Sequence, residues 1–368
     1  MISLFNIKAE DAWEYGSKAA NLGELQNHIW GVPPGIVLSP DEMPEEGKPF
    51  DTHIRNMMSM ANSCGLAWES DSTGEALYAV RSSGVAEDGE DSSYAGQHDT
   101  FLSVKRKDIL KRVEDCRKSS IKAKAYRDAK GEEDKGIAVL IMPMIRATTA
   151  GVLFTADPIE MRLDNAILEY VEGVGDKLVS GQVNPEESYT ISHATGEYDP
   201  SLEDDEGYKA LTLRRVYDLG QSIAKQFGKP MDIEWAAADN RVWILQARPI
   251  TTGGRRWTIP DMKGRPVMPG VVMGKASWVE SGALIEDEED TFETNSILLT
   301  RMTEPHMVPL MRKAAGIATE IGGRTCHAAI VSRELQKPCV VGVTNLRAVP
   351  NNVQILVDGA AGTVEAVC

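Results

Sequence analysis

The chain has 368 residues, which is long enough for two or three domains with sizeable cores. Its composition is ordinary for a soluble globular protein, with 42 % hydrophobic and 26 % charged residues. The formal net charge of −16 argues against general binding of nucleic acid or of an anionic membrane surface. Any phosphate ligand must therefore be met by a local cluster of basic residues.

The cysteine pattern and the N-terminus indicate a cytoplasmic protein. The five cysteines show no paired spacing, which fits reduced thiols rather than disulfides or a zinc site. Residues 1–15 lack the basic flank and apolar run of a signal peptide, and no apolar run approaches membrane-spanning length. The sequence therefore predicts no membrane partner.

The first half of the chain mixes helical and strand patterns. Residues 40–76 are rich in Pro, Glu, Asp, Ser and Gly, which predicts a loop and a short helix. The densely charged segment 105–130 has apolar residues at helical spacing. Short apolar runs predict strands at 136–142, 150–155 and 165–171. An amphipathic helix is predicted over 207–227, before Gly228 and Pro230.

A domain boundary is predicted near residues 251–256, a polar Gly-containing stretch that follows a clear strand. Four short apolar runs come after it, and a helical pattern lies between the second and the third. This alternation predicts a small α/β or layered β/α domain. The acidic run 286–290 reads as a solvated loop. The four runs are 296–300, 315–319, 338–343 and 353–357.

Two N-terminal segments carry residues suited to phosphate. Lys18 follows Gly16-Ser17 at a predicted helix start, where an ammonium group can act as a point charge. Arg81 ends a short apolar strand, and Ser82 and Ser83 after it offer hydroxyl and backbone donors. An ordinary helix start and an ordinary Ser/Gly loop are the alternatives.

A predicted hairpin places four polar side chains together. Both halves of residues 232–249 alternate in polarity, and 239–241 suit a short turn. With the turn centred on Asn240, Glu234 lies opposite Gln246 and Asp232 lies opposite Arg248. All four side chains then point to one side of the hairpin.

That face suits Mg²⁺ bound to a polyphosphate, because carboxylate and amide oxygens bind the metal and arginine binds a phosphate. The alternative is a solvated polar face with cross-strand ion pairs. The same register turns Ile233, Trp235 and Leu245 toward the core.

Two further residues are candidates for the nucleotide. Glu169 ends another apolar strand and could bind the ribose or support the metal; a plain strand-end glutamate is the alternative. Met144, in the segment 142–145, could line an adenine slot at a hinge, although methionines in an apolar strand are commonly core residues.

His327 lies at a predicted helix start, just after Gly322-Gly323. A helix N-terminus presents unpaired N–H groups and a partial positive charge, which suit a phosphoryl group. Imidazole is also a competent nucleophile that forms covalent intermediates. A phosphorylated histidine is therefore one interpretation, and a core histidine at a helix cap is the other.

These motifs together resemble a known enzyme family, that of phosphoenolpyruvate synthase, pyruvate phosphate dikinase and rifampicin phosphotransferase. Residues 1–250 resemble its nucleotide-binding domain through GSKAANLGEL, VRSSGVAEDGEDSSYAGQHDTFL, GVLFTADP, GDKLVSGQVNPEESY and DIEW…WILQARPIT. Residues 264–367 resemble its mobile phosphohistidine domain through PGVVMGKA, LLTRMTEPHMVPLMRKAAGIATEIGGRTCHAAIVSREL, PCVVGV and DGAAGTV. The synthase branch is the most similar.

The resemblance implies an α+β and α/β architecture: an ATP-grasp domain over 1–250, a linker over 251–263 and a swivelling β/β/α phosphohistidine domain over 264–368. It implies that Lys18, Arg81 and Arg248 bind ATP phosphates and that Glu234 and Gln246 hold Mg²⁺. Asp232 and Glu169 would lie near the nucleotide.

In the second domain the resemblance implies that His327 is phosphorylated. We expect Arg324 and the helix N-terminus to hold the phosphoryl group in transit. Thr325 matches a threonine that some family members phosphorylate as an off-switch.

The implied activity is ATP-dependent phosphorylation of His327 from the β-phosphate, with AMP and phosphate as products. The phosphoryl acceptor, a small molecule such as pyruvate or a separate protein, is expected in trans, because the chain has no room for the pyruvate-binding barrel and is expected to be naturally short. A small-molecule or antibiotic phosphotransferase with an interdomain acceptor site, and an inactive ATP-binding regulator, are the alternatives. The sequence leaves open whether the protein forms a homodimer.

Overall fold

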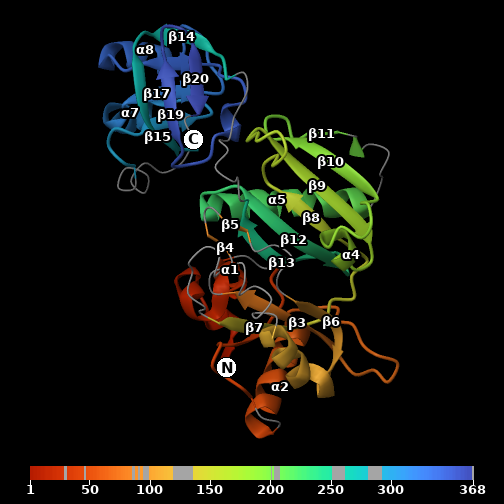
Figure 1. Ribbon diagram of the computed structural model, residues 1–368. Helices are drawn as coiled ribbons and strands as arrows, with labels where there is room; N and C mark the ends of the chain where they lie inside the picture. The colour runs from red at the N-terminus through yellow and green to blue at the C-terminus, as the bar shows by residue number, and fades with distance from the viewer. Residues whose placement is uncertain are drawn as a thin grey trace.

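The computed structural model describes residues 1–28, 31–44, 47–84, 88–89, 92–93, 99–118, 136–199, 201–202, 208–250, 262–280 and 292–366. Within these residues, three large sheets follow one another along the chain (Figure 1). Side chains from the first two sheets line a common cavity. The third sheet forms a separate body at the C-terminal end of the chain (Figure 1).

The first sheet has five strands in the order β1-β2-β7-β3-β6 and is antiparallel throughout. Helices α1 (Ala12–His28) and α2 (Lys48–Ser63) pack against it, as does a helix over 109–118. Short 3-10 turns lie at Leu4–Asn6, Ala9–Asp11 and Arg106–Asp108. A separate two-stranded ribbon joins β4 (Asp88–Gly89) and β5 (Ser92–Ser93). The strands of the first sheet are β1 (Ile2–Ser3), β2 (Ile36–Leu38), β3 (Leu77–Gly84), β6 (Thr100–Lys105) and β7 (Ile137–Pro143).

Helix α1 is broken at Gly16, which has φ 76° and ψ 156°. The helical turn after the break therefore starts next to Lys18, and its exposed N–H groups need acceptors. Ser83 Oγ on β3 accepts a hydrogen bond from the Ala19 N–H at 3.0 Å. The strand thus caps the helix and fixes Lys18 beside β3.

The second sheet has six antiparallel strands in the order β11-β10-β9-β8-β12-β13. Helix α5 (Tyr208–Phe227) packs against it, and the short helix α4 (Asp176–Val179) follows β9. Buried apolar residues of both sheets and of α1 form one cluster, so the two sheets share a core. The strands are β8 (Thr149–Phe154), β9 (Asn165–Glu172), β10 (Glu187–Ser192), β11 (Tyr198–Asp199), β12 (Met231–Ala238) and β13 (Arg241–Pro249).

The β12–β13 hairpin has the predicted pairs but not the predicted turn. Glu234 pairs with Gln246 and Asp232 pairs with Arg248, as expected. The turn is the two-residue Asp239-Asn240, in which both residues have positive φ, as tight hairpins require. A β-bulge between Glu234 and Trp235 moves the register by one residue and restores the predicted pairs.

The bulge also overturns one prediction. Leu245 was expected to face the core with Ile233 and Trp235, which are both buried. Instead Leu245 is the extra residue of the bulge, because Ile244 pairs with Trp235. Leu245 is half-buried and lines the cavity between the first two sheets.

The third sheet has the order β14-β18-β17-β16-β15-β19-β20. The pairs β15–β16, β16–β17 and β17–β18 are parallel, and the pairs β14–β18, β15–β19 and β19–β20 are antiparallel. Helices α7 (Val308–Lys313) and α8 (His327–Leu335) and 3-10 turns η5 (Pro305–Met307) and η6 (Leu346–Ala348) connect its strands. The strands are β14 (Arg265–Met268), β15 (Val271–Trp278), β16 (Ile297–Thr300), β17 (Gly316–Thr319), β18 (Cys339–Val341), β19 (Gln354–Asp358) and β20 (Thr363–Ala366).

Most predicted elements are confirmed. Strands β7, β8 and β9, helix α5, the four C-terminal strands and the helix between the second and third of them lie where the patterns placed them. The prediction of a short helix within 40–76 is wrong about its length. Helix α2 has 16 residues and buries Phe50, Ile54 and Met57. The linker segment 251–261 and the acidic run 286–290 lie outside the described residues.

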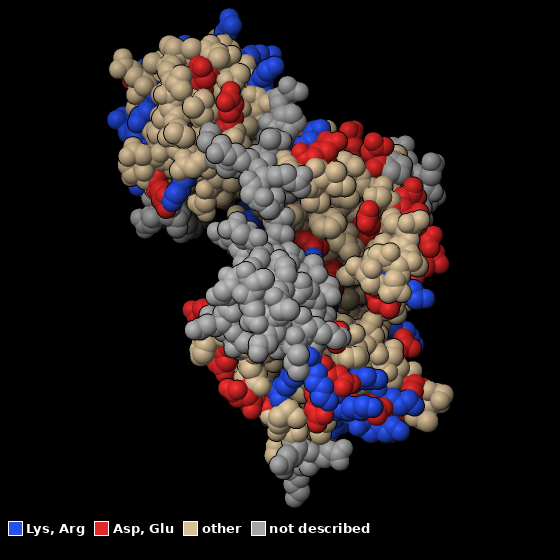
Figure 2. All heavy atoms as spheres, viewed as in Figure 1, with Lys and Arg blue, Asp and Glu red and all other residues tan. Residues whose placement is uncertain are grey.

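Charges are unevenly spread over the surface. Figure 2 shows Lys and Arg gathered at the end of the molecule formed by the first sheet, while Asp and Glu are more frequent over the second sheet. Ion pairs partly neutralise the basic cluster, including Lys105 with Asp71 at 2.9 Å and Arg112 with Asp115 at 3.0 Å. No helix of the described residues is long and apolar enough to cross a membrane.

We predict that Gly16→Ala destabilises the protein more than Gly74→Ala does. Both glycines have positive φ, so each substitution costs about 1 kcal/mol of backbone strain. A Cβ at Gly16 would lie 2.4 Å from Ser83 O, whereas a Cβ at Gly74 meets open space. Urea unfolding should therefore show the greater loss for Gly16→Ala, and equal losses would contradict the close packing of α1 on β3.

Candidate functional site

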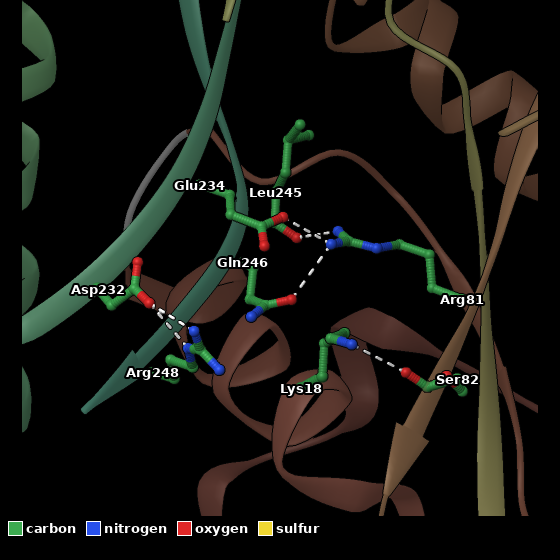
Figure 3. Close-up of polar contacts among 8 residues, drawn as sticks. All are labelled: Lys18, Arg81, Ser82, Asp232, Glu234, Leu245, Gln246 and Arg248. Atoms are coloured by element: carbon green, nitrogen blue, oxygen red, sulfur yellow. Dashed lines mark hydrogen bonds and ion pairs between the residues drawn. The ribbon is translucent and has the colours of Figure 1, made fainter. Parts of the chain in front are cut away.

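A cavity of about 520 Å³ lies between the first two sheets. Its lining includes Lys18, Arg81, Glu234, Gln246 and Arg248. All five were predicted as ligand-binding residues from segments far apart in the chain, and the fold brings them to one place (Figure 3). The volume falls in the range of about 300–1,000 Å³ that is usual for small-molecule sites.

Arg81 joins the two sheets across this cavity. It extends from β3, and its Nη2 donates to Glu234 Oε2 at 2.7 Å and to Gln246 Oε1 at 3.2 Å (Figure 3). Its Nη1 donates to the carbonyl oxygen of Leu245 at 2.5 Å. The β-bulge exposes this carbonyl, so a backbone irregularity of β13 supplies one of the three acceptors for the guanidinium.

Arg81 is only 8 % exposed, and its Nε is buried with no hydrogen-bond partner among the described residues. Burial of a charge is costly unless the charge is paired, and Glu234 provides the pairing carboxylate. The unsatisfied Nε–H is a donor that an anionic ligand could satisfy after a small shift of the side chain.

Lys18 contributes a second buried cation. It is 8 % exposed, and its Nζ donates to the carbonyl oxygen of Ser82 at 3.0 Å. The break at Gly16 and the cap by Ser83 fix this position. An ammonium group held at a cavity wall beside a helix start suits a phosphate oxygen.

Asp232 and Arg248 form a cross-strand ion pair. Arg248 Nε donates to Asp232 Oδ2 at 2.9 Å, and Nη2 lies 2.8 Å from the same oxygen. Burial raises the pKa of Asp232 above its usual range, while Arg248 opposes that shift. Arg248 is 28 % exposed and lines the cavity, so it is oriented by Asp232 and still accessible to a ligand.

The predicted metal pair, Glu234 and Gln246, fits one cation. Both side-chain oxygens contact the same Arg81 nitrogen, so they converge on one point. Carboxylate and amide oxygens are ligands that Mg²⁺ accepts, with phosphate oxygens and water completing the shell. No group of three or more His, Cys, Asp or Glu side chains converges among the described residues, so these two would depend on the substrate for further ligands.

Ser82 and Ser83 are fully buried and already hydrogen-bonded. Ser82 Oγ donates to the carbonyl oxygen of Asp99 at 2.8 Å, and Ser83 Oγ caps α1. Neither serine lines the cavity. The structure thus gives them a role in positioning Lys18 and Arg81, and direct phosphate binding stays a prediction.

Met144 lines the cavity, but Glu169 does not. The backbone of Met144 is occupied, because its N–H donates to Leu77 O and its carbonyl accepts from Glu69 N. Glu169 lies in the same cross-strand row as Glu234 with Val152 between them, and it accepts a hydrogen bond from Ser188 Oγ at 3.2 Å. Their nucleotide contacts stay predictions.

His327 is the first residue of α8, at the carboxyl-end side of the parallel strands. It is half-exposed, and Arg324 and Thr325 before it are exposed. Its Nδ1 lies 2.9 Å from Thr303 Oγ1, and Thr303 is 4 % exposed. Sequence patterns gave no signal for Thr303, because its contact with His327 spans 24 residues and arises only from the folded loop.

The structure does not bring His327 to the cavity. All described residues that line the cavity lie between Lys18 and Arg248. Figure 1 shows α8 on the side of the C-terminal body away from β12 and β13. The candidate site therefore has two separate parts, a cavity lined by buried cations and a half-exposed histidine.

Comparisons with known proteins agree with this division. The family model "Pyruvate phosphate dikinase, AMP/ATP-binding domain" matches residues 48–197 and 190–264. The chain belongs to this family. The model "PEP-utilising enzyme, mobile domain" matches residues 292–362. The first two sheets thus belong to an AMP/ATP-binding domain, and the third sheet belongs to a PEP-utilising mobile domain; the exact domain boundaries stay predictions.

Several curated relatives are similar over most of this chain. A probable phosphoenolpyruvate synthase of Methanothermobacter thermautotrophicus is 32 % identical, and the alignment covers 96 % of this chain and 62 % of that protein. A probable phosphoenolpyruvate synthase of Archaeoglobus fulgidus is 34 % identical, and the alignment covers 79 % of this chain and 43 % of that protein. The phosphoenolpyruvate synthase of Pyrococcus furiosus is 32 % identical, covering 79 % and 41 %. The chain therefore spans about two fifths to three fifths of these relatives.

We predict that Glu234→Gln weakens Mg²⁺-dependent ATP binding at least about tenfold. The substitution removes the charged member of the metal pair and the partner of buried Arg81. Asp239→Asn is the matched control, because Asp239 carries the same charge in the exposed hairpin turn. Calorimetric titration of each variant with ATP, in the presence and absence of Mg²⁺, measures the two affinities. An unchanged affinity in Glu234→Gln would exclude this metal site.

Proposed function

We propose that this chain is an ATP-dependent phosphotransferase that phosphorylates its own His327 and delivers the phosphoryl group to an acceptor supplied in trans. One observation carries the proposal: buried Arg81 and Lys18 and the oxygens of Glu234 and Gln246 line one cavity of a domain whose family binds AMP or ATP. The chemistry takes place in the cytoplasm, as the cysteine pattern predicts.

The proposed reaction converts ATP, water and His327 into phospho-His327, AMP and phosphate. His327 Nε2 forms a bond to the β-phosphorus, and the bond from that phosphorus to the oxygen bridging to the α-phosphorus breaks. The electron pair of that bond leaves on AMP. Water then cleaves the terminal phosphate from the histidine-bound diphosphate, so all atoms are accounted for.

The residues of the cavity act by positioning and charge. Lys18, Arg81 and Arg248 bind phosphate oxygens and hold the chain of phosphates in line for attack, which is the main protein contribution to phosphoryl transfer. Mg²⁺ held by Glu234 and Gln246 would neutralise charge on the phosphates. The mutual contacts among these side chains keep them preorganised.

The hydrogen bond between His327 and Thr303 determines which ring nitrogen is free to attack. When Nδ1–H donates to Thr303 Oγ1, the lone pair of the neutral imidazole is on Nε2. Thr303 is buried, so it holds both the tautomer and the ring direction.

An apolar surface surrounds His327. Met302, Ile321 and Ile330 are each exposed by 44–48 % and belong to the loops and helix turn next to the histidine. On the nucleotide domain, Val174 and Val179 line the ATP cavity and are exposed by 43 % and 49 %. Two exposed apolar patches beside the two reacting parts support docking of α8 against the cavity rim.

The charges beside these two patches are opposite. Arg301 and Arg324 are exposed near His327, whereas the exposed charges next to the cavity rim, Glu172, Asp176 and Lys177, have a net negative sum. Opposite charges favour the encounter and set its orientation. The proposal therefore requires the C-terminal body to move from the arrangement in Figure 1 until His327 reaches the phosphates.

We predict that His327→Ala abolishes self-phosphorylation and leaves ATP binding unchanged. The substitution removes the only proposed nucleophile, and His327 does not line the ATP cavity. Incubation with Mg²⁺ and ATP labelled at the β-phosphate, followed by detection of acid-labile label, measures the reaction. His28→Ala, at an exposed helix end, should label normally. Label retained in His327→Ala would refute the assignment.

We predict that Thr303→Val slows labelling of His327 by about two- to twelvefold, the rate equivalent of one hydrogen bond worth about 0.5–1.5 kcal/mol. Thr303→Ser should restore the rate, because it keeps the hydroxyl that contacts Nδ1. The pH dependence of the labelling rate should also change in Thr303→Val. A purely packing role would leave that pH dependence as it is, and Thr303→Ser would then not restore the rate.

A further inference from the structure

One wall of the ATP cavity comes from the segment between β9 and β10, which includes the helical turn α4. Within this turn and the residue after it, Asp176, Val179 and Ser180 line the cavity, whereas Lys177 and Leu178 do not. Positions i, i+3 and i+4 share one face of a helix. The turn therefore directs one face, with the Asp176 side chain on it, toward the cavity.

Contacts on both sides of Asp176 fix the turn against the second sheet. Before it, a Cβ at Gly175 would lie 3.1 Å from Ala150 Cβ, so the turn begins in close contact with β8. After it, Leu178 is on the opposite face of the turn and is only 8 % exposed. Asp176 lies between these two contacts, so its place over the sheet is set by packing.

The strand register separates the polar end of the cavity from its apolar end. Glu234 lies in one cross-strand row on the cavity face of β12, and Ala236 lies in the next row, paired with Ala150 of β8. Both alanines belong to an apolar cluster that also contains Ile145, another residue of the cavity lining. The row after the predicted metal pair is thus the start of the apolar end, and α4 begins over that row.

Asp176 is an acid without a protein partner at this boundary. Its carboxylate has no hydrogen bond or ion pair with the described residues, whereas the other carboxylate of the lining, Glu234, lies 2.7 Å from Arg81. Phosphate groups would repel a free carboxylate. A metal between Glu234 and Gln246 would lie one row away, about 7 Å along the strand, which is beyond coordination distance. Neither phosphate nor metal therefore suits Asp176.

The remaining polar part of a nucleotide is its sugar. The ribose lies between the phosphates and the base, just as Asp176 lies between the metal row and the apolar end. A carboxylate has two acceptor oxygens for neighbouring hydroxyls, and acidic side chains hold ribose hydroxyls in dinucleotide-binding folds. Glu169, for which the sequence suggested a ribose contact, does not line the cavity and accepts a hydrogen bond from Ser188.

We propose that Asp176 binds the 2′- and 3′-hydroxyls of the nucleotide and makes the cavity select ribonucleotides over 2′-deoxyribonucleotides. The inference rests on the proposed binding of ATP in this cavity. It gives Asp176 a role in substrate selection that is separate from the positioning of the phosphates by Lys18, Arg81 and Arg248.

Calorimetric titration of the His327→Ala chain with ATP and with 2′-deoxy-ATP, in the presence of Mg²⁺, tests the proposal without phosphoryl transfer during the measurement. We expect ATP to bind about tenfold or more tightly, the effect of one hydrogen bond to a charged group. Adding Asp176→Ala should bring the ratio of the two affinities close to one. Adding Asp176→Asn should give an intermediate ratio, because its amide oxygen still accepts a weaker, neutral hydrogen bond.

The ratio distinguishes a direct contact from a general effect of charge. Removal of the Asp176 charge alone changes the binding of both nucleotides equally, because their phosphates are identical, and leaves the ratio as it was. Asp199→Asn is the matched control, because Asp199 is an exposed acid of β11 outside the cavity lining. This variant should keep the full preference for ATP.

Equal affinities for the two nucleotides in the His327→Ala chain would overturn the ribose assignment and leave ATP binding in place. A full preference for ATP that persists in Asp176→Ala would overturn it as well. Binding of neither nucleotide would refute the proposed function, and the ribose assignment with it.

Discussion

The contacts of the Arg81 guanidinium are the interaction on which the rest of the site depends. Arg81 starts on one sheet and ends on the other, where it meets Glu234, Gln246 and the Leu245 carbonyl (Figure 3). A buried charge must be paired, so this contact fixes the separation of the two sheets as well as the positions of the groups between them. The same side chains that pair in this arrangement are the ones that a metal–nucleotide would contact. In the proposed function, substrate binding would be an exchange of partners within this polar cluster.

Backbone geometry prepares this cluster at two places. The β-bulge at Leu245 turns a strand carbonyl toward Arg81 while keeping Glu234 opposite Gln246. The break of α1 at Gly16 lets the next helical turn start against β3, where Ser83 caps it and Lys18 reaches the cavity. In both cases a local irregularity, held by tertiary contacts, sets the direction of a charged or polar group.

Because His327 lies apart from the cavity, the proposed phosphoryl transfer depends on the relative position of the two bodies. A nucleophile that must travel needs an exposed surface, and His327 lies among exposed apolar residues on α8 and its neighbouring loops. In this structure the C-terminal body contacts the nucleotide domain through a buried apolar cluster that includes Leu163 and Val349. The balance between these two positions, rather than the geometry of either alone, would set how often phosphoryl transfer occurs.

The sequence by itself determined much of this protein. Alternation of polarity predicted the β12–β13 pairs, because side chains on a strand alternate by residue, and the motifs identified the two family domains. It could not place the bulge, the length of α2, the burial of Ser82 and Ser83 or the contact of Thr303 with His327. Each of these depends on residues distant in the chain. Only the tertiary structure decided that Arg81 spans two sheets and that His327 lies apart from them, because both follow from how whole bodies pack rather than from any local pattern.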